Sequence, residues 1–299
     1  MDFRFLSSAQ VEHFLAKGYV VLKGCFSREF AQGWTDFAWK RVGYDPRDQK
    51  TWKEPRLHLP AQRHAEVKTL APQAWGAILE LVGGEARAVQ PYNWADAFIM
   101  NLGIGADRPW EGPSAKSPGW HKDGDFFMHF LDSPEQGLLT LVIWSDIQTR
   151  GGGTFIAPDS VGVVARYLAQ HPEGVHPFKF PMGELIGQCK EFVEMTGEVG
   201  DVVLLHPYML HASSQNVLGI PRFITNPPIH LKEPMNFNRA DANEFSPVER
   251  GVLRGLGVER YDFKLTGPRE KVVPERVKIQ QKMLEEEKAR LAAASASKA

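Results

Sequence analysis

The chain has 299 residues, which is enough for one large hydrophobic core or two smaller ones. Its hydrophobic content of 43% and charged content of 24% are ordinary for a globular protein, and its formal net charge of −1 argues against nucleic acid or an anionic membrane as a partner. It has no apolar run long enough to cross a bilayer, no secretory signal and only two cysteines, so we expect a cytoplasmic protein with reduced thiols.

Helical patterns dominate the first 87 residues. Apolar residues recur there at spacings of three and four, and glycines follow the patterns at their ends. We therefore expect helices over 7–18, 27–41 and 71–82. Residues 18–23 are typical of a strand, whereas 45–66 are rich in proline, histidine and charge and are expected to form a long loop.

From residue 88 the pattern changes to short strand-like runs separated by glycine and proline. Candidate strands lie at 96–102, 138–144, 153–157, 190–196, 201–206 and 222–226. Many short strands after a helical first part predict a sandwich or barrel with helices on one side. We expect an insertion at 159–186 with one short helix near 161–169.

The segment from Pro274 to the end of the sequence is charged and then rich in alanine, serine and lysine. Apolar residues recur there every seven positions, but the positions between them, including Gln280 and Glu287, are too polar for a convincing coiled coil. We expect a solvated helix that frays into a disordered tail.

The most informative short motif is His121-Lys122-Asp123. In a strand the first and third of these side chains point to the same face, so both could bind one metal ion while Lys122 points away. A histidine from elsewhere would complete the two-histidine, one-carboxylate set that is typical of non-haem Fe(II) oxygenases. Asp125 is a rival carboxylate, but it is less well placed in an extended chain.

Two histidines, His206 and His211, could supply the third ligand. They are five residues apart, so a regular strand would direct them to opposite faces. We favour His211, because a hairpin at 216–221 would return Arg222 beside its strand, and a guanidinium suits a carboxylate ligand. His206 precedes a proline and is expected to be packed or hydrogen-bonded.

Together, these motifs resemble the phytanoyl-CoA dioxygenase-like family of the Fe(II)/2-oxoglutarate-dependent oxygenases, in patches over about 5–230. The resemblance is carried by Leu6 to Phe14, Gly18 to Leu22, Trp120-His121-Lys122-Asp123, Trp144 to Pro158, Gly200-Asp201, His211-Ala212-Ser213, Asn216 and Arg222. The chain departs from the family at Lys122, where glutamine is frequent, and at 157–160, where the usual Pro-Gly-Ser-His is absent.

The resemblance implies a mainly β fold with flanking helices and a double-stranded β-helix (jelly-roll, cupin-like) core. It implies one oxygenase domain over 1–270, with a helical part at about 5–87, the core at about 88–230 and an extension at 231–270, before a charged tail at 271–299. It further implies Fe(II) on His121, Asp123 and His211, and 2-oxoglutarate held by Arg222 and Ser213. Trp144 would line the cosubstrate, although the residue by itself is as well explained by the core.

The implied activity is the oxidation of a small-molecule metabolite by O2, through hydroxylation, desaturation or cyclisation, with 2-oxoglutarate converted to succinate. No acid or base is expected beyond the metal ligands. A small amphiphilic substrate is favoured over a CoA thioester, because basic residues near the expected site are few. Phe126, Phe127 and Phe130 could line the substrate pocket or belong to the core.

Two alternative functions remain. One is a cupin-like metal-dependent isomerase or hydrolase, which would not need Arg222 and Ser213. The other is a non-catalytic binding protein of the same fold.

Overall fold

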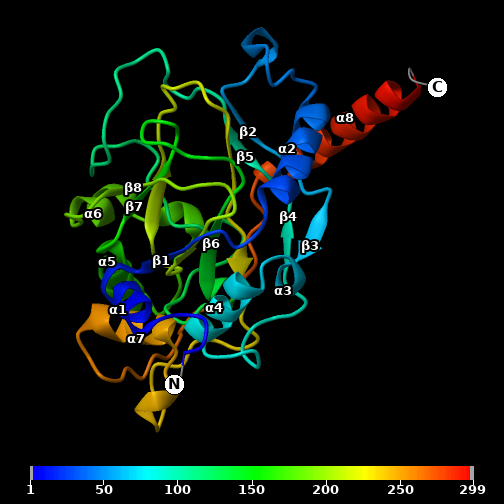
Figure 1. Ribbon diagram of the computed structural model, residues 1–299. Helices are drawn as coiled ribbons and strands as arrows, with labels where there is room; N and C mark the ends of the chain where they lie inside the picture. The colour runs from blue at the N-terminus through cyan, green and yellow to red at the C-terminus, as the bar shows by residue number, and fades with distance from the viewer. Residues whose placement is uncertain (1–2, 297–299) are drawn as a thin grey trace.

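Antiparallel sheets form the centre of the molecule, and helices flank them (Figure 1). The computed structural model describes residues 3–296. A seven-stranded sheet has the order β1-β9-β6-β11-β5-β2 with β12 added beside β6, a three-stranded sheet has the order β10-β7-β8, and β3 pairs with β4. The strands are β1 Tyr19–Leu22, β2 Arg56–His58, β3 His64–Glu66, β4 Asn93–Ala95, β5 Ile99–Asn101, β6 Leu138–Ile143, β7 Thr154–Ala157, β8 Val193–Met195, β9 Val202–Leu205, β10 Leu210–Ser213, β11 Arg222–Thr225 and β12 Pro228–Ile229.

Both faces of the large sheet are buried. Along β6, Leu139 and Leu141 face an apolar cluster that also contains Ile156 of the small sheet. Leu138 and Val142 face the opposite way, into the larger core that the helices share. The central strands β6 and β9 are therefore mainly apolar along their whole length, and the space between the two sheets is a second, smaller core.

The helices begin and end close to where the sequence predicts. Ser7 and Ser27 cap the first two helices, and glycines in the left-handed region end them. The helices are α1 Ser8–Lys17, α2 Arg28–Val42, α3 Val67–Leu70, α4 Pro72–Val82, α5 Ser160–Ala169, α6 Met182–Gly187, α7 Pro247–Leu256 and α8 Arg276–Ala296. The expectation of a β core flanked by helices is confirmed, and the insertion contains α6 in addition to its predicted helix.

The prediction of a long loop over 45–66 is wrong, because this segment contains a short 3-10 turn, Gln49–Thr51, and the strands β2 and β3. Each strand has only three residues, and polar residues dominate both, so no periodic pattern marks them. Pairing with β5 alone makes β2 the edge of the large sheet. This edge strand brings Arg56 and His58 to a cavity described below.

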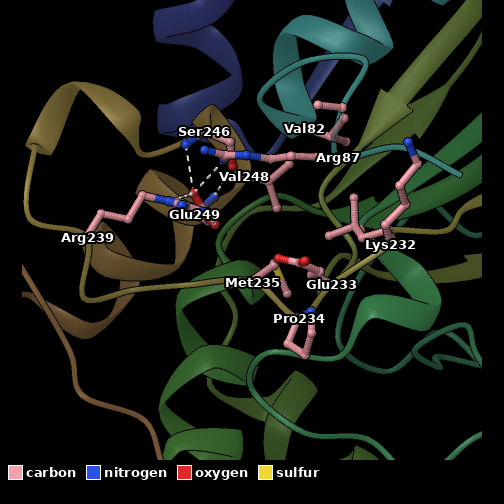
Figure 2. A pocket seen from close by; sticks show the side chains of 13 residues that line it. Val82, Arg87, Lys232, Glu233, Pro234, Met235, Arg239, Ser246, Val248 and Glu249 are labelled. Carbon is pink, nitrogen blue, oxygen red and sulfur yellow. Dashed lines mark hydrogen bonds and ion pairs between the residues drawn. The ribbon is translucent and has the colours of Figure 1, made fainter.

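A buried carboxylate organises the start of α7 (Figure 2). Glu249 and Ser246 form a capping box, and Glu249 also accepts hydrogen bonds from Arg239 at 2.6 and 3.0 Å and from Arg87 at 3.2 Å. Burial alone would raise the pKa of Glu249, but the hydrogen bonds from Arg239 and two backbone amides outweigh it and lower that pKa. Arg87, Arg239, Ser246 and Glu249 line a cavity of about 320 Å³, and all four are engaged with one another by hydrogen bonds.

The last helix, α8, packs against α2 (Figure 1). Most of its residues are exposed, as expected of a solvated helix, but Glu287 is only 1% exposed. Arg41 binds Glu287 at 2.8 Å and Asp96 at 2.9 Å, so a buried ionic network joins α8 to the rest of the chain. The final part of the predicted tail, 297–299, lies outside the described residues. Within 3–296, no helix is long and apolar enough to cross a membrane.

Candidate metal centre

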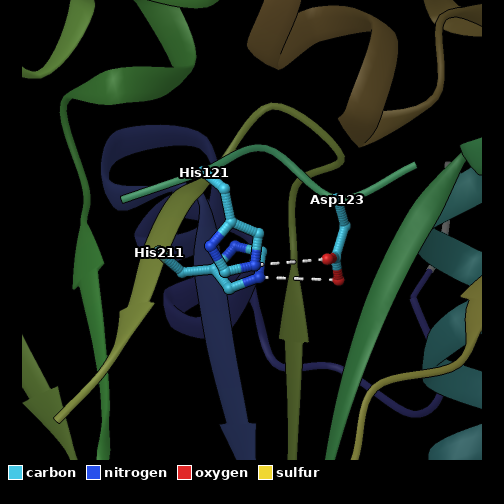
Figure 3. Close-up of side chains that lie close together, drawn as sticks. All are labelled: His121, Asp123 and His211. Atoms are coloured by element: carbon cyan, nitrogen blue, oxygen red, sulfur yellow. Dashed lines mark ion pairs between the residues drawn. The ribbon is translucent and has the colours of Figure 1, made fainter. Parts of the chain in front are cut away.

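Three side chains predicted from the sequence converge at one point (Figure 3). Nε2 of His121 and Nε2 of His211 each lie 3.5 Å from a different carboxylate oxygen of Asp123, and the two imidazole centroids are 4.3 Å apart. Two donors that bind one ion at about 2.1 Å can be no more than about 4.2 Å apart, so each His–Asp separation fits a shared ion. The donor set of two imidazoles and one carboxylate is the one that non-haem Fe(II) oxygenases use.

The sequence predicted that His121 and Asp123 lie on a regular strand, and this prediction is wrong. His121 forms only an isolated bridge, with His211 of β10, and Asp123 lies in the bend that follows. Gly119 and Gly124 on either side have φ of +80° and +108°, values that favour glycine. The bend, rather than strand alternation, therefore brings the carboxylate back to the imidazoles.

Hydrogen bonds orient all three groups. Nδ1 of His121 lies 2.8 Å from the Gly119 carbonyl oxygen, and Nδ1 of His211 lies 3.0 Å from that of Met209. With each Nδ1–H donating to its carbonyl, each Nε2 is directed at Asp123. Burial would raise the pKa of Asp123, but His211 and His121 outweigh it and hold that pKa well below its usual value. The carboxylate is therefore ionised, the form that binds metal.

Sequence reasoning missed one residue of this centre, Asn226. Its Nδ2 donates a 2.7 Å hydrogen bond to Asp123 Oδ2. Asn226 directly follows β11 and lines the same small cavity as Ile224, two positions before it. The even spacing from Arg222 was the available signal, since alternate residues of an extended chain share a face.

Lys122 points away from the ligand atoms and braces the loop behind them. Its half-buried ammonium donates to His129 Nδ1 at 2.9 Å, to Gln136 Oε1 at 3.3 Å and to the Asp123 carbonyl oxygen at 3.2 Å. Burial lowers the pKa of Lys122 to about 7. Burial, and then the charge of Lys122, also hold the pKa of His129 well below its usual value, so His129 is a neutral acceptor.

The ligands open onto a cavity of about 510 Å³. Phe126 lines this cavity, whereas Phe127 and Phe130 are buried in the protein interior. The insertion at 159–186 contributes Pro177 and Phe178 to the lining. The other lining residues are Arg56, His58, Asn93, Ala95, Ala97, Ile99, His121, Lys122, Asp123, Gly124, Asp125, Gln136, Thr225, Asn226, Pro227, Pro228 and Arg276.

Arg222 and Ser213 lie on different sheets, so the predicted hairpin between their strands is wrong. Ser213 of β10 lines a smaller cavity together with His211 and Ile224. Arg222 is two residues before Ile224 on β11 and so faces the same interior.

The guanidinium of Arg222 is buried and unpaired. Arg222 is 1% exposed, and its Nε and Nη1 have no hydrogen-bond partner among residues 3–296. Burial, with a contribution from Arg56, lowers its pKa to about 9. An unpaired buried guanidinium is costly, and a bound carboxylate would relieve that cost.

Trp144 lies on the face of the large sheet opposite Ile224, and this position argues against its predicted place beside the cosubstrate. It stacks on Trp34 of α2 with centroids 4.9 Å apart and an interplanar angle of 6°. Its Nε1 donates to the Thr225 hydroxyl at 3.0 Å. Strand alternation explains the difference, because Leu139 and Leu141 of β6 face the second core while Val142 and Trp144 face the helices.

The rival ligands have other partners. His206 is buried beside Phe14 and its Nε2 lies 3.2 Å from the Val248 carbonyl oxygen. Burial lowers the pKa of His206 to about 3, so it is neutral, as expected of a packed histidine. Asp125 accepts hydrogen bonds of 2.5 and 2.7 Å from Arg276 of α8.

Comparison with known proteins gives one family and several solved structures. The family model described as Phytanoyl-CoA dioxygenase (PhyH) matches residues 14–224. The chain is similar to the non-heme alpha ketoglutarate dependent carbocyclase SnoK from nogalamycin biosynthesis, with 16% identity, a TM-score of 0.46 and coverage of 76% of this chain and 84% of that one. It is also similar to EctD from S. alaskensis with 2-oxoglutarate and 5-hydroxyectoine (18% identity, TM-score 0.42, coverage 77% and 78%). AviO1 from Streptomyces viridochromogenes Tue57 gives 16% identity, a TM-score of 0.43 and coverage of 78% and 97%. No curated protein sequence matches the chain.

Proposed function

The chain belongs to the phytanoyl-CoA dioxygenase family, and from that premise we propose that it is an Fe(II)- and 2-oxoglutarate-dependent oxygenase of a small-molecule metabolite. One observation carries the proposal. An oriented set of two histidines and one carboxylate faces the same interior as a buried, unpaired arginine. The two facing sheets would then be the halves of a double-stranded β-helix within a single domain over 1–270.

We assign His121, Asp123 and His211 as the iron ligands. Both Nε2 atoms and the ionised carboxylate are directed at one another before any ion binds, so little reorganisation opposes binding. Asn226 holds Asp123 Oδ2 and thereby sets the plane of the carboxylate. When bound, iron with 2-oxoglutarate supplies the activation of O2 that oxidises the substrate and releases succinate and CO2.

We assign Arg222 and Ser213 to the distal carboxylate of 2-oxoglutarate. The free donors of Arg222 suit a carboxylate, which can accept two parallel hydrogen bonds from one guanidinium. Ser213 lines the interior beside His211 and offers a hydroxyl donor. The apolar residues around Arg222, including Ile224 and Ile99, exclude water and strengthen that ion pair.

The cavity in front of the ligands supports a small amphiphilic substrate. Its volume of about 510 Å³ is within the range of small-molecule sites, and its lining mixes apolar with charged side chains. Hydroxylation, desaturation and cyclisation are all outcomes of the proposed chemistry, and none needs an acid or base beyond the ligands. The protein's part is to position the substrate near the metal and keep bulk water out.

The test is oxygen-dependent succinate formation. The full chain would be loaded with Fe(II) and 2-oxoglutarate without O2, mixed with a library of small metabolites, and exposed to O2. We expect succinate to form above the uncoupled background with a subset of the library, and only when 2-oxoglutarate is present. Turnover of a compound without 2-oxoglutarate would instead support a cupin-like isomerase or hydrolase. Failure to bind 2-oxoglutarate in the presence of Fe(II) would overturn the proposal.

A further inference from the structure

A cation without a partner lies at the edge of the active-site cavity. Arg56 begins β2 and is opposite Asn101 of β5, which is in turn opposite Arg222 of β11. The three residues therefore form one row across the sheet and share a face. Arg56 is exposed and lines both the large cavity and the smaller one beside His211. Beyond the backbone pairing of β2, its side chain forms no hydrogen bond or ion pair with any residue in 3–296.

The other cations that line the cavity have partners. Arg276 is paired with Asp125 at 2.5 Å, and the three donors of Lys122 are used by His129, Gln136 and a backbone carbonyl. Burial lowers the pKa of His58, two residues after Arg56, so that imidazole is neutral near pH 7.

The charges at the metal centre would also balance without Arg56. In the loaded enzyme, the two positive charges of Fe(II) and that of Arg222 match those of Asp123 and the 2-oxoglutarate dianion. Arg56 is then the one cation lining this cavity, among the described residues, whose side chain has neither a hydrogen-bond partner nor a counterion. A positive charge at the edge of a cleft with apolar walls raises the local concentration of anions there.

We propose that Arg56 binds an anionic group of the substrate, a carboxylate or a phosphate. This assignment rests on the proposed function and narrows it to small amphiphilic acids. The apolar part of such a substrate would lie against Phe126, Pro177 and Phe178, which line the same cavity. Arg56 is then a specificity-determining residue, since a neutral analogue would leave its guanidinium without a partner.

Calorimetric titration of the full chain, loaded with Fe(II) and 2-oxoglutarate without O2, tests the proposal. The probes are benzoate, phenyl phosphate and the neutral benzamide, and the variants are Arg56→Gln, Arg56→Lys and Lys53→Gln. Lys53 is an exposed cation three positions earlier that lines neither cavity, so its variant controls for a general loss of charge. The better of the two anions distinguishes a carboxylate site from a phosphate site.

We expect Arg56→Gln to weaken binding of the preferred anion by at least about tenfold, as for loss of a charged hydrogen bond. Arg56→Lys should retain part of the affinity, and Lys53→Gln all of it. Benzamide should bind weakly and equally to every variant. Equal anion binding by wild type and Arg56→Gln would overturn the proposal, as would the absence of anion binding to the wild type.

A separate titration of 2-oxoglutarate distinguishes this proposal from the proposed function. We expect Arg56→Gln to bind 2-oxoglutarate within threefold of wild type, whereas Arg222→Met should bind it about 10- to 100-fold more weakly. A similar loss in both variants would assign Arg56 to the cosubstrate and overturn the inference alone. If the wild type binds no Fe(II) or 2-oxoglutarate, the proposed function fails. In that case, the Arg222→Met variant and the double variant Arg56→Gln, Arg222→Met would be titrated with the anions in the absence of iron and cosubstrate. The difference between the two affinities still tests whether Arg56 binds an anion.

Discussion

His121 and His211 exchange both of their backbone hydrogen bonds, each 3.0 Å long, although they are far apart in the sequence. This pairing sets the two imidazoles side by side by main-chain geometry alone. Asp123 then needs only the bend at Gly124 and the hydrogen bond from Asn226 to face them. The ligand set is therefore formed before an ion arrives, and each of its parts can be tested separately.

Asp123→Ala should abolish tight Fe(II) binding. The variant removes the one anionic ligand, so we expect the affinity to fall by more than about 100-fold, beyond the effect of losing an outer partner. Anaerobic Fe(II) titration measures it. Asp125→Ala is the matched control, because that neighbouring carboxylate is paired with Arg276. An equal loss in both variants would contradict the assignment of Asp123.

Arg222→Met should lose 2-oxoglutarate but not iron. We expect the cosubstrate to bind about 10- to 100-fold more weakly, because a charged hydrogen-bond partner is gone. Without 2-oxoglutarate, the free energy of unfolding should equal or exceed that of wild type, because an unpaired buried charge has been replaced by an apolar chain. Titration and urea unfolding measure the two effects. Cosubstrate affinity at the wild-type level would show that Arg222 does not bind 2-oxoglutarate.

Asn226→Ala should weaken Fe(II) binding by about 10- to 100-fold while the fold is kept. The expected size is that of losing a hydrogen bond that orients a metal ligand. Asn93→Ala is the control, because Asn93 lines the same cavity and no hydrogen bond joins it to Asp123. The same Fe(II) affinity in the Asn226 and Asn93 variants would mean that Asp123 does not depend on Asn226.

Trp144→Phe should affect stability and not the cosubstrate. The variant loses the hydrogen bond to Thr225 and part of the stacking on Trp34, so we expect a loss of about 1–3 kcal/mol in the free energy of unfolding. The affinity for 2-oxoglutarate should remain within threefold of wild type. If instead the affinity falls while the unfolding free energy is unchanged, Trp144 contacts the cosubstrate after all.

Glu249→Gln should destabilise the protein in a pH-dependent manner. The folded pKa of Glu249 is lowered from its ordinary value of 4.5, so its contribution is complete above pH 4.5 and is lost as pH falls through the folded pKa. We expect the variant to be about 2 kcal/mol less stable at pH 7, and the difference to shrink at acid pH. Urea unfolding of both proteins across pH 3–7 measures it. A difference independent of pH would rule out the ionised carboxylate as its source.

Local signals explain which elements could be predicted. Serine caps mark the starts of α1 and α2, a proline begins α4, and a terminal glycine ends each of the three, so their limits follow from nearby residues. The continuous apolar runs of β6 and β9 indicate strands buried on both faces. Short edge strands carry no such signal, and β2 was missed for that reason.

The sequence by itself determined the chemical types in the candidate site, since two histidines, a carboxylate and an arginine stand in a spacing that few other functions need. Only the tertiary structure decided which sheet each strand joins and which face each side chain takes. It directed Trp144 to the helices, and it brought Asn226, Arg56 and Arg276 to the cavity. The physical reason is that strand pairing and sheet packing depend on contacts between distant segments, and a difference of one residue in register reverses the face of every side chain.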